Sequence, residues 1–128
     1  MATLAEVMRT EFITVAPEDT LGEVADKMVA LNVGAVVVKD FGKLIGILTE
    51  RDLLKAMAAR VHSSEARVRQ FMTENPVTVS REMDCEEAER LMLDKGFRHL
   101  PITDGDDVVG VVSLRRVVAA TKAAAAAS

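Results

Sequence analysis

The sequence is poor in aromatic residues and in cysteine. Its 128 residues include no Trp, no Tyr and only four Phe, so burial has to rest on Val, Leu, Ile, Met and Ala. Cys85 is the one cysteine, which excludes an internal disulfide and a metal cluster built from several cysteines. Hydrophobic residues still make up 49% of the chain. A core is therefore expected, in one compact domain or in two small halves that share it.

Long apolar runs and an excess of positive charge are also missing. No apolar stretch approaches the roughly 18 residues of a membrane span, and the opening "MATLAEVMRTEF" lacks the basic region of a signal peptide. We expect a cytoplasmic protein with no membrane contact. The net charge of −4 and the pI near 5.2 argue against a surface that follows nucleic-acid phosphates. The Ala-rich tail, residues 123–128, is compatible with an extended last helix or with a frayed end.

Catalytic and metal-binding arrangements are not visible either. The two histidines, His62 and His99, are far apart in the sequence and distant from Cys85. No spacing of Ser, His and Asp suggests a nucleophile with its base. We therefore expect no enzyme activity, no bound metal and no resident cofactor. Cys85 falls on the apolar face of an expected helix and is interpreted as a small core residue.

What the chain does contain is an internal repeat. A shift of 64 positions places Gly46 on Gly110, Met28 on Met92 and Arg51 on Arg115 without a gap. The apolar pattern is kept throughout. We predict two repeats, residues 1–62 and 63–128, whose structured parts run over about 5–58 and 69–122.

Each repeat predicts the same order of elements, β-α-β-β-α. "ITV" (13–15) and "VTV" (77–79) are the first strands. A helix follows Thr20, with Glu23 completing a capping box; Asp84 and Glu87 hold those places in the second repeat, where Gly96 is a stop signal. Hairpins are expected over 35–40 with 44–48 and over 100–104 with 108–112, and the last helices over 50–60 and 114–124.

A sheet with helices on one face leaves its other face uncovered. Two such units can cover each other, which predicts an α/β (α+β) fold with two units packed sheet to sheet about a pseudo-two-fold axis. Two related clefts would then form, one for each repeat.

The segment "GILTERD" (46–52) lies where the second hairpin strand of the first repeat meets its last helix. Thr49 is suited to the N-cap position and Asp52 to the third helical position, as in a capping box. Alternatively, the helix start binds a phosphate and the Asp52 carboxylate accepts the hydroxyls of a ribose. The two interpretations are compatible with each other.

The doubled unit, with "GILTERD" at its junction, resembles a CBS (cystathionine β-synthase) domain pair, also called a Bateman module. "VMRTEFITVAPEDTLGEVADKM" and "NVGAVVVKDFGKLIGILTERDLLKA" carry the resemblance in the first repeat. "FMTENPVTVSREMDCEEAERLM" and "GFRHLPITDGDDVVGVVSLRRVVAA" carry it in the second. The resemblance covers about residues 5–122. It implies a regulatory module that binds adenosine compounds (AMP, ADP, ATP or S-adenosylmethionine) and forms homodimers through its helices.

The resemblance also implies roles for individual residues. Asp52 would hold the ribose, and Thr49 would contact the ribose or the phosphate. Three residues would lie near the phosphates: Gly34, Ala35 and Arg51. Three candidates from the second repeat would line the base: Val77, Thr78 and Phe97.

The second repeat departs from this pattern. It reads "GVVSLRR" (110–116), so Ser113 keeps the hydroxyl but Arg116 replaces the ribose-binding Asp. Two cations at a helix start oppose the helix dipole and suggest a nearby anion. The candidates for a phosphate or polyphosphate site are Ser113, Arg115, Arg116, Arg98 and His99, bordered by Ile13, Thr14 and Val33. The alternative is salt bridges to the acidic loop of Asp104, Asp106 and Asp107, or to a partner chain.

We therefore expect a stand-alone nucleotide sensor that reports its ligand to a protein partner. The competing hypothesis is a scaffold with empty clefts that serves dimerisation of a partner protein. The sequence does not select the adenosine ligand or the partner.

Overall fold

The computed structural model describes residues 2–127 and has a mixed α/β fold, as expected. The chain divides into two compact units. Residues 12–76 form one, here called the Asp52 unit; residues 2–11 and 77–127 form the other, here called the Arg116 unit. This spatial division differs from the repeats predicted at 1–62 and 63–128, because a short segment of each repeat belongs to the unit formed mainly by the other.

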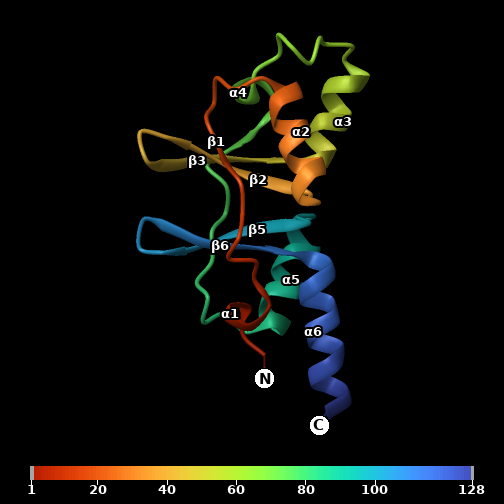
Figure 1. The fold of residues 1–128 in the computed structure, drawn as a ribbon. Helices are drawn as coiled ribbons and strands as arrows, with labels where there is room; N and C mark the ends of the chain where they lie inside the picture. The colour runs from red at the N-terminus through yellow and green to blue at the C-terminus, as the bar shows by residue number, and fades with distance from the viewer. Residues whose placement is uncertain (1, 128) are drawn as a thin grey trace. The chain divides into compact units, whose positions relative to one another are not determined.

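The Asp52 unit is built on a four-stranded sheet of order β1-β2-β3-β4 (Figure 1). Its strands are β1 (Thr14–Val15), β2 (Ala35–Asp40), β3 (Lys43–Thr49) and β4 (Thr73–Glu74). β1 runs parallel to β2, while β2–β3 and β3–β4 are antiparallel. The predicted hairpin is confirmed.

Helices α2 (Leu21–Leu31), α3 (Glu50–Ala58) and α4 (Val68–Phe71) complete this unit. The predicted capping box of Thr20 and Glu23 starts α2, and Asn32 ends it in the left-handed conformation. The core gathers the inward side chains of the sheet and the apolar faces of α2 and α4; it includes Leu21, Val24, Met28, Val36, Val38, Leu48 and Val68.

The Arg116 unit contains α5 (Cys85–Lys95), the hairpin β5 (His99–Asp104) with β6 (Asp107–Ser113), and α6 (Leu114–Ala127). Gly96 ends α5 in the left-handed conformation, as predicted. Asp84 is the N-cap, but its side chain makes no capping hydrogen bond, so the predicted second capping box is wrong. The predicted strand 77–79 is reduced to one parallel bridge between Val79 and Ile102.

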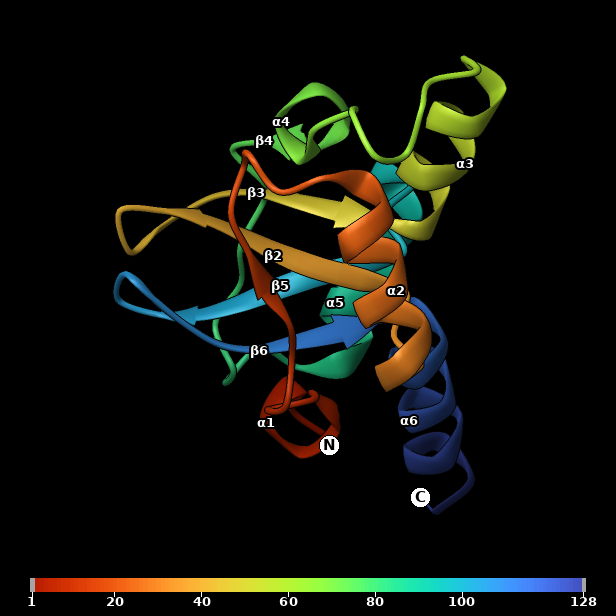
Figure 2. The same ribbon diagram turned by 45° about the horizontal axis from the view of Figure 1, so that its top comes forward.

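Each unit also contains an arm that comes from the other repeat. The N-terminal arm (residues 2–11), which carries α1 (Leu4–Val7), packs in the Arg116 unit. The linker arm (residues 66–75), which carries α4 and β4, packs in the Asp52 unit; Figure 2 shows α4 and β4 beyond the β3 edge. Leu4 and Val68 occupy equivalent positions of the repeat, and both are fully buried. We did not predict these short helices, because four residues are too few to give a helical period.

Two equivalent glycines allow the arms to approach the sheets closely. A Cβ on Gly46 would lie 2.7 Å from the Met72 sulfur and 2.9 Å from the Thr73 carbonyl oxygen. A Cβ on Gly110 would lie 2.7 Å from the Met8 sulfur and 3.0 Å from the Arg9 carbonyl oxygen. The repeat therefore keeps a glycine under each arm for a steric reason.

Candidate functional site

The candidate site of the Asp52 unit lies where β2 begins, β3 ends and α3 begins. Ala35 pairs with Thr49 across the two strands. The Glu50 amide, the first of α3, donates to the Gly34 carbonyl at 2.9 Å. This bond ties the loop before β2 to the helix start. Five of the predicted site residues therefore converge at one place: Gly34, Ala35, Thr49, Arg51 and Asp52.

Asp52 makes the capping box predicted from its spacing. Its Oδ2 accepts hydrogen bonds from the Thr49 amide at 2.8 Å and from the Thr49 hydroxyl at 3.1 Å. The Asp52 amide in turn donates to Thr49 Oγ1 at 3.4 Å. Asp52 is 8% exposed and is the one charged residue buried within residues 2–127. The hydrogen bonds of its carboxylate all involve Oδ2, so Oδ1 remains available to an incoming donor.

The helix start is favourable to negative charge, but it is not an open row of amides. Glu50 and Asp52 both lie in the first turn of α3 and complement its dipole. The Glu50 amide is already bonded to Gly34, and the Asp52 amide faces Thr49. Arg51 is exposed. Because these two amides are already engaged, a phosphate near this point would be bound mainly by the Arg51 guanidinium.

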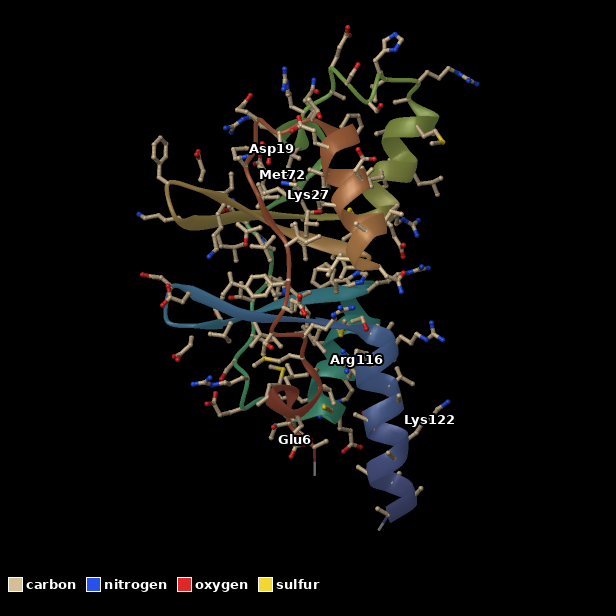
Figure 3. The ribbon with its side chains drawn as sticks, viewed as in Figure 1. Glu6, Asp19, Lys27, Met72, Arg116 and Lys122 are labelled. Carbon is tan, nitrogen blue, oxygen red and sulfur yellow. The ribbon has the colours of Figure 1, made fainter. Side chains whose placement is uncertain are left out.

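The equivalent point of the Arg116 unit has the same backbone and different chemistry. His99 pairs with Ser113, and the Leu114 amide donates to the Arg98 carbonyl at 2.8 Å. Ser113 Oγ accepts a hydrogen bond from the Arg116 amide at 3.3 Å. No carboxylate completes a capping box at this helix start, and Arg116 is exposed at the first turn of α6, with Lys122 further along the same helix (Figure 3).

The acidic loop does not neutralise these cations. Asp104 pairs with Asp107 at the far end of the β5–β6 hairpin from His99 and Ser113, a separation of about 17 Å at strand spacing. Asp104 instead contacts Arg81 at 3.4 Å. Within residues 2–127, Arg98, Arg115 and Arg116 form no ion pair with a carboxylate. For these three arginines, the predicted alternative of salt bridges to the acidic loop is therefore wrong, while salt bridges to a partner chain stay a prediction.

The remaining candidate residues of each site belong to the unit that does not contain that site's helix start. Val77, Thr78 and Phe97, expected beside Asp52, are part of the Arg116 unit. Ile13, Thr14 and Val33, expected beside Arg116, are part of the Asp52 unit. Val77 and Thr78 are exposed, and Phe97 is half-buried against its own core. Whether each set completes the other site stays a prediction.

Comparison with known proteins places both repeats in one family. The CBS domain model matches residues 4–59 and again residues 68–123. The chain therefore belongs to the CBS domain family, and it carries two tandem copies of the domain.

Relatives and solved structures agree with this assignment. The chain is 35% identical over 114 residues to the CBS domain-containing protein YhcV of Bacillus subtilis, covering 89% of this chain and 81% of YhcV. It is 37% identical to the uncharacterized protein MK0525 of Methanopyrus kandleri, covering 90% of this chain but only 60% of that longer protein. The crystal structure of the CBS-domain containing protein ATU1752 from Agrobacterium tumefaciens has a TM-score of 0.86 at 32% identity, covering 94% and 99% of the two chains.

One further solved structure of similar fold contains bound ligands. It is the CBS domain pair of protein MJ0100 in complex with 5′-methylthioadenosine and S-adenosyl-L-methionine, with a TM-score of 0.84 and 22% identity, covering 95% of this chain and 97% of that one. At this identity the likeness shows the fold alone. Within residues 2–127, no helix is long and apolar enough to cross a membrane.

Proposed function

We propose that the protein is a regulatory module, not an enzyme, that binds an adenosine nucleotide or S-adenosylmethionine at Asp52 and passes the ligand state to a protein partner. The observation that carries this proposal is the buried Asp52 carboxylate, of which Oδ2 caps α3 while Oδ1 has no donor within residues 2–127. An acceptor held rigidly in this way suits the adjacent hydroxyls of a ribose. The adenosine ligands in the MJ0100 domain pair support the same ligand class.

The proposal gives the surrounding residues the roles that the family resemblance implies. Thr49 has its hydroxyl directed to Asp52 and contacts the ribose or phosphate. Arg51, together with the backbone of Gly34 and Ala35, lies near the phosphates. Val77, Thr78 and Phe97 line the base. Charge-assisted hydrogen bonds of this kind contribute about 1.5–3 kcal/mol each.

The test is a ligand screen followed by substitution. A melting-temperature screen against AMP, ATP, NADH and S-adenosylmethionine identifies the ligand. Asp52→Ala should then weaken binding by roughly tenfold to a hundredfold in calorimetry, since one or two charged hydrogen bonds are lost. Asp84→Ala is the matched control, because Asp84 is an N-cap aspartate in the other unit that makes no capping bond. Equal affinities in Asp52→Ala and the parent protein would refute the assignment.

A second candidate function concerns the Arg116 unit. Four groups that can carry positive charge, Arg98, His99, Arg115 and Arg116, lie at the junction of β5, β6 and α6, away from the acidic loop. We propose that they bind a phosphate or polyphosphate group, with Ser113 contributing its hydroxyl and with Ile13, Thr14 and Val33 at the border. Arg116→Ala should reduce the thermal stabilisation produced by phosphate and leave adenosine binding at Asp52 intact. A melting temperature that phosphate does not change in either protein would contradict this site.

Association into a homodimer is part of the proposal. Exposed apolar side chains occur on helices of both units: Val29, Leu54 and Met57 in the Asp52 unit and Leu93 in the Arg116 unit, each more than 60% exposed. A contiguous exposed apolar patch is typical of an interface between protein chains, and we propose that these helix positions contribute to one. If none of the four ligands shifts the melting temperature at millimolar concentration, the scaffold hypothesis is favoured over the sensor.

A further inference from the structure

The two arms are held differently, although the first amides of their short helices are docked in the same way. The Leu4 and Ala5 amides donate to Met83 and Arg81 carbonyls, both at 2.9 Å. The equivalent Val68 and Arg69 amides donate to Asp19 and Pro17 carbonyls, also at 2.9 Å. These helix-start bonds do not distinguish the arms, but the pairing with the sheet does. Thr73 and Glu74 pair with β3 as strand β4, and the Asn75 amide donates to the Ile45 carbonyl at 3.1 Å, whereas within residues 2–127 the N-terminal arm pairs with β6 only at Arg9.

A side-chain clamp holds the linker arm. Arg69 Nε donates to Glu18 Oε1 at 2.7 Å, and its Nη2 lies 4.0 Å from Asp40 Oδ2. Arg67 Nη1 donates to the Glu18 carbonyl at 3.0 Å. The hydrogen bond to Glu18, with smaller contributions from the Glu18 and Asp40 charges, raises the pKa of Arg69. The two contacts with Glu18 join residues 49 and 51 positions apart, so they tie the arm to the body of the Asp52 unit.

Among residues 2–127, no corresponding clamp holds the N-terminal arm. The positions equivalent to Arg67 and Arg69 are Thr3 and Ala5, neither of which carries a positive charge. The two acids have equivalents, Glu82 and Asp104, but their arginine is Arg81, which lies on the body of the unit. One arginine bridges the acids in each unit, and only in the Asp52 unit does it belong to the arm.

From this difference we infer that the N-terminal arm opens independently and before the rest of the fold, whereas the linker arm opens only with its unit. Two observations support this order. The linker arm is clamped by Arg69 and paired with β3 over two residues, while the N-terminal arm has no such clamp within residues 2–127 and is held by backbone bonds and the buried Leu4. Elements with few side-chain ties to the rest of a fold are the first to open locally.

Opening of this arm has a defined structural consequence. The arm pairs with β6 through two hydrogen bonds between Arg9 and Val111, at 2.9 and 3.0 Å. Val111 lies two residues before Ser113, and the arm continues directly into Ile13 and Thr14. Release of the arm exposes the edge of β6. It also changes the conformation of the segments next to Ser113, Ile13 and Thr14, which are candidate residues of the phosphate site.

Native-state hydrogen exchange on the full chain tests this inference. After correction for intrinsic rates, the Leu4 and Ala5 amides should exchange at least about tenfold faster than the Val68 and Arg69 amides. Raising the salt concentration should speed exchange of the linker arm, because ion pairs are screened, and leave the N-terminal arm unchanged. Equal rates in the two arms, or exchange of Leu4 only at the rate of global unfolding, would overturn the inference.

Transplanting the clamp provides the matched variants. Ala5→Arg with Arg81→Ala moves the arginine of the Arg116 unit from the body to the arm, and should slow exchange of Leu4 by about two- to fivefold, the effect expected of a surface ion pair. Ala5→Gln with Arg81→Ala is the uncharged control and should not slow it. Arg69→Ala should speed exchange of Val68 by a similar factor. Unchanged rates in both the transplant and Arg69→Ala would show that the arginines do not set the difference.

Discussion

The starts of α3 and α6 share one backbone and differ in the side chain at one position. In both, the first helical amide donates to a carbonyl before the preceding hairpin, and a hydroxyl side chain accepts from the third residue of the helix. That third residue is Asp52 in α3 and Arg116 in α6. Asp52 turns inward to complete a capping box, while Arg116 is exposed.

The difference between Asp52 and Arg116 shows that the fold does not require a carboxylate at the third helical position. α6 forms without a carboxylate at its start, so the Asp52 capping box is not a requirement of the architecture. At α6 two arginines also oppose the helix dipole, at about 0.3–1 kcal/mol each. The two units therefore share the backbone of the helix start but carry opposite charges at the third helical position. This pattern is expected if the two helix starts bind different ligands.

The largest effect is expected when Asp52 is given the side chain of its counterpart. Asp52→Arg removes the capping box, worth about 0.5–2 kcal/mol, and places a cation at a position that is 8% exposed beside the positive end of a helix. Together these changes should cost about 2–4 kcal/mol of unfolding free energy, measured by urea denaturation.

The reciprocal exchange is the control. Arg116→Asp gives α6 the Ser-x-x-Asp pattern of α3 and should raise the unfolding free energy by about 0.5–1 kcal/mol. A loss below about 1 kcal/mol in Asp52→Arg, or destabilisation by Arg116→Asp, would mean that the two helix starts are not equivalent environments.

Much of this arrangement is predictable from the sequence because it depends on local spacing. The Thr49–Asp52 box, the Thr20–Glu23 box and the Gly96 stop each involve residues within one helical turn, and the shift of 64 positions transfers them between repeats. The same transfer was wrong for Asp84, whose side chain makes no capping bond. Local spacing identifies which residues can bond, but it does not determine whether a side chain turns toward the helix.

The arms were not predictable in this way, because their partners are distant in sequence. Arg69 contacts Glu18 and Asp40, and Arg9 pairs with Val111; no periodicity within either repeat indicates these contacts. The repeat did contain one signal, the glycine at 46 and 110, whose steric reason becomes visible only when Met72 and Met8 are placed over it. The acidic loop shows the same limit, since its distance from Arg116 follows from hairpin register.

An intermediate effect is expected when the two glycines are compared. Gly46→Ala pushes a methyl group against the Met72 sulfur and the Thr73 carbonyl oxygen and should cost about 1–3 kcal/mol, as overpacking does. Gly110→Ala meets equivalent atoms, but within residues 2–127 the N-terminal arm has no counterpart of the Arg69 clamp, so it can lift more easily. Its cost, measured in the same denaturation series, should be the smaller of the two, and a larger cost for Gly110→Ala would indicate that the N-terminal arm is the more firmly held.

The smallest effect concerns the equivalent core positions Leu21 and Cys85, both buried at the start of a helix. Burial, with the nearby Asp84 and Glu6 charges, raises the pKa of the Cys85 thiol above its usual value. The neutral thiol therefore contributes stability that is fully present below the unfolded pKa, near 8.5, and is lost as pH rises through the raised folded value. The loss should be nil at pH 7 and below about 1 kcal/mol at pH 9.

The variant Cys85→Val tests this expectation, because valine, like Leu21, cannot ionise. The unfolding free energy of the variant should not show this fall at alkaline pH, whereas that of the parent protein should. An unchanged slope would show that the thiol ionises as readily in the fold as in the unfolded chain, and that the two core positions differ in solvent access as well as in side chain.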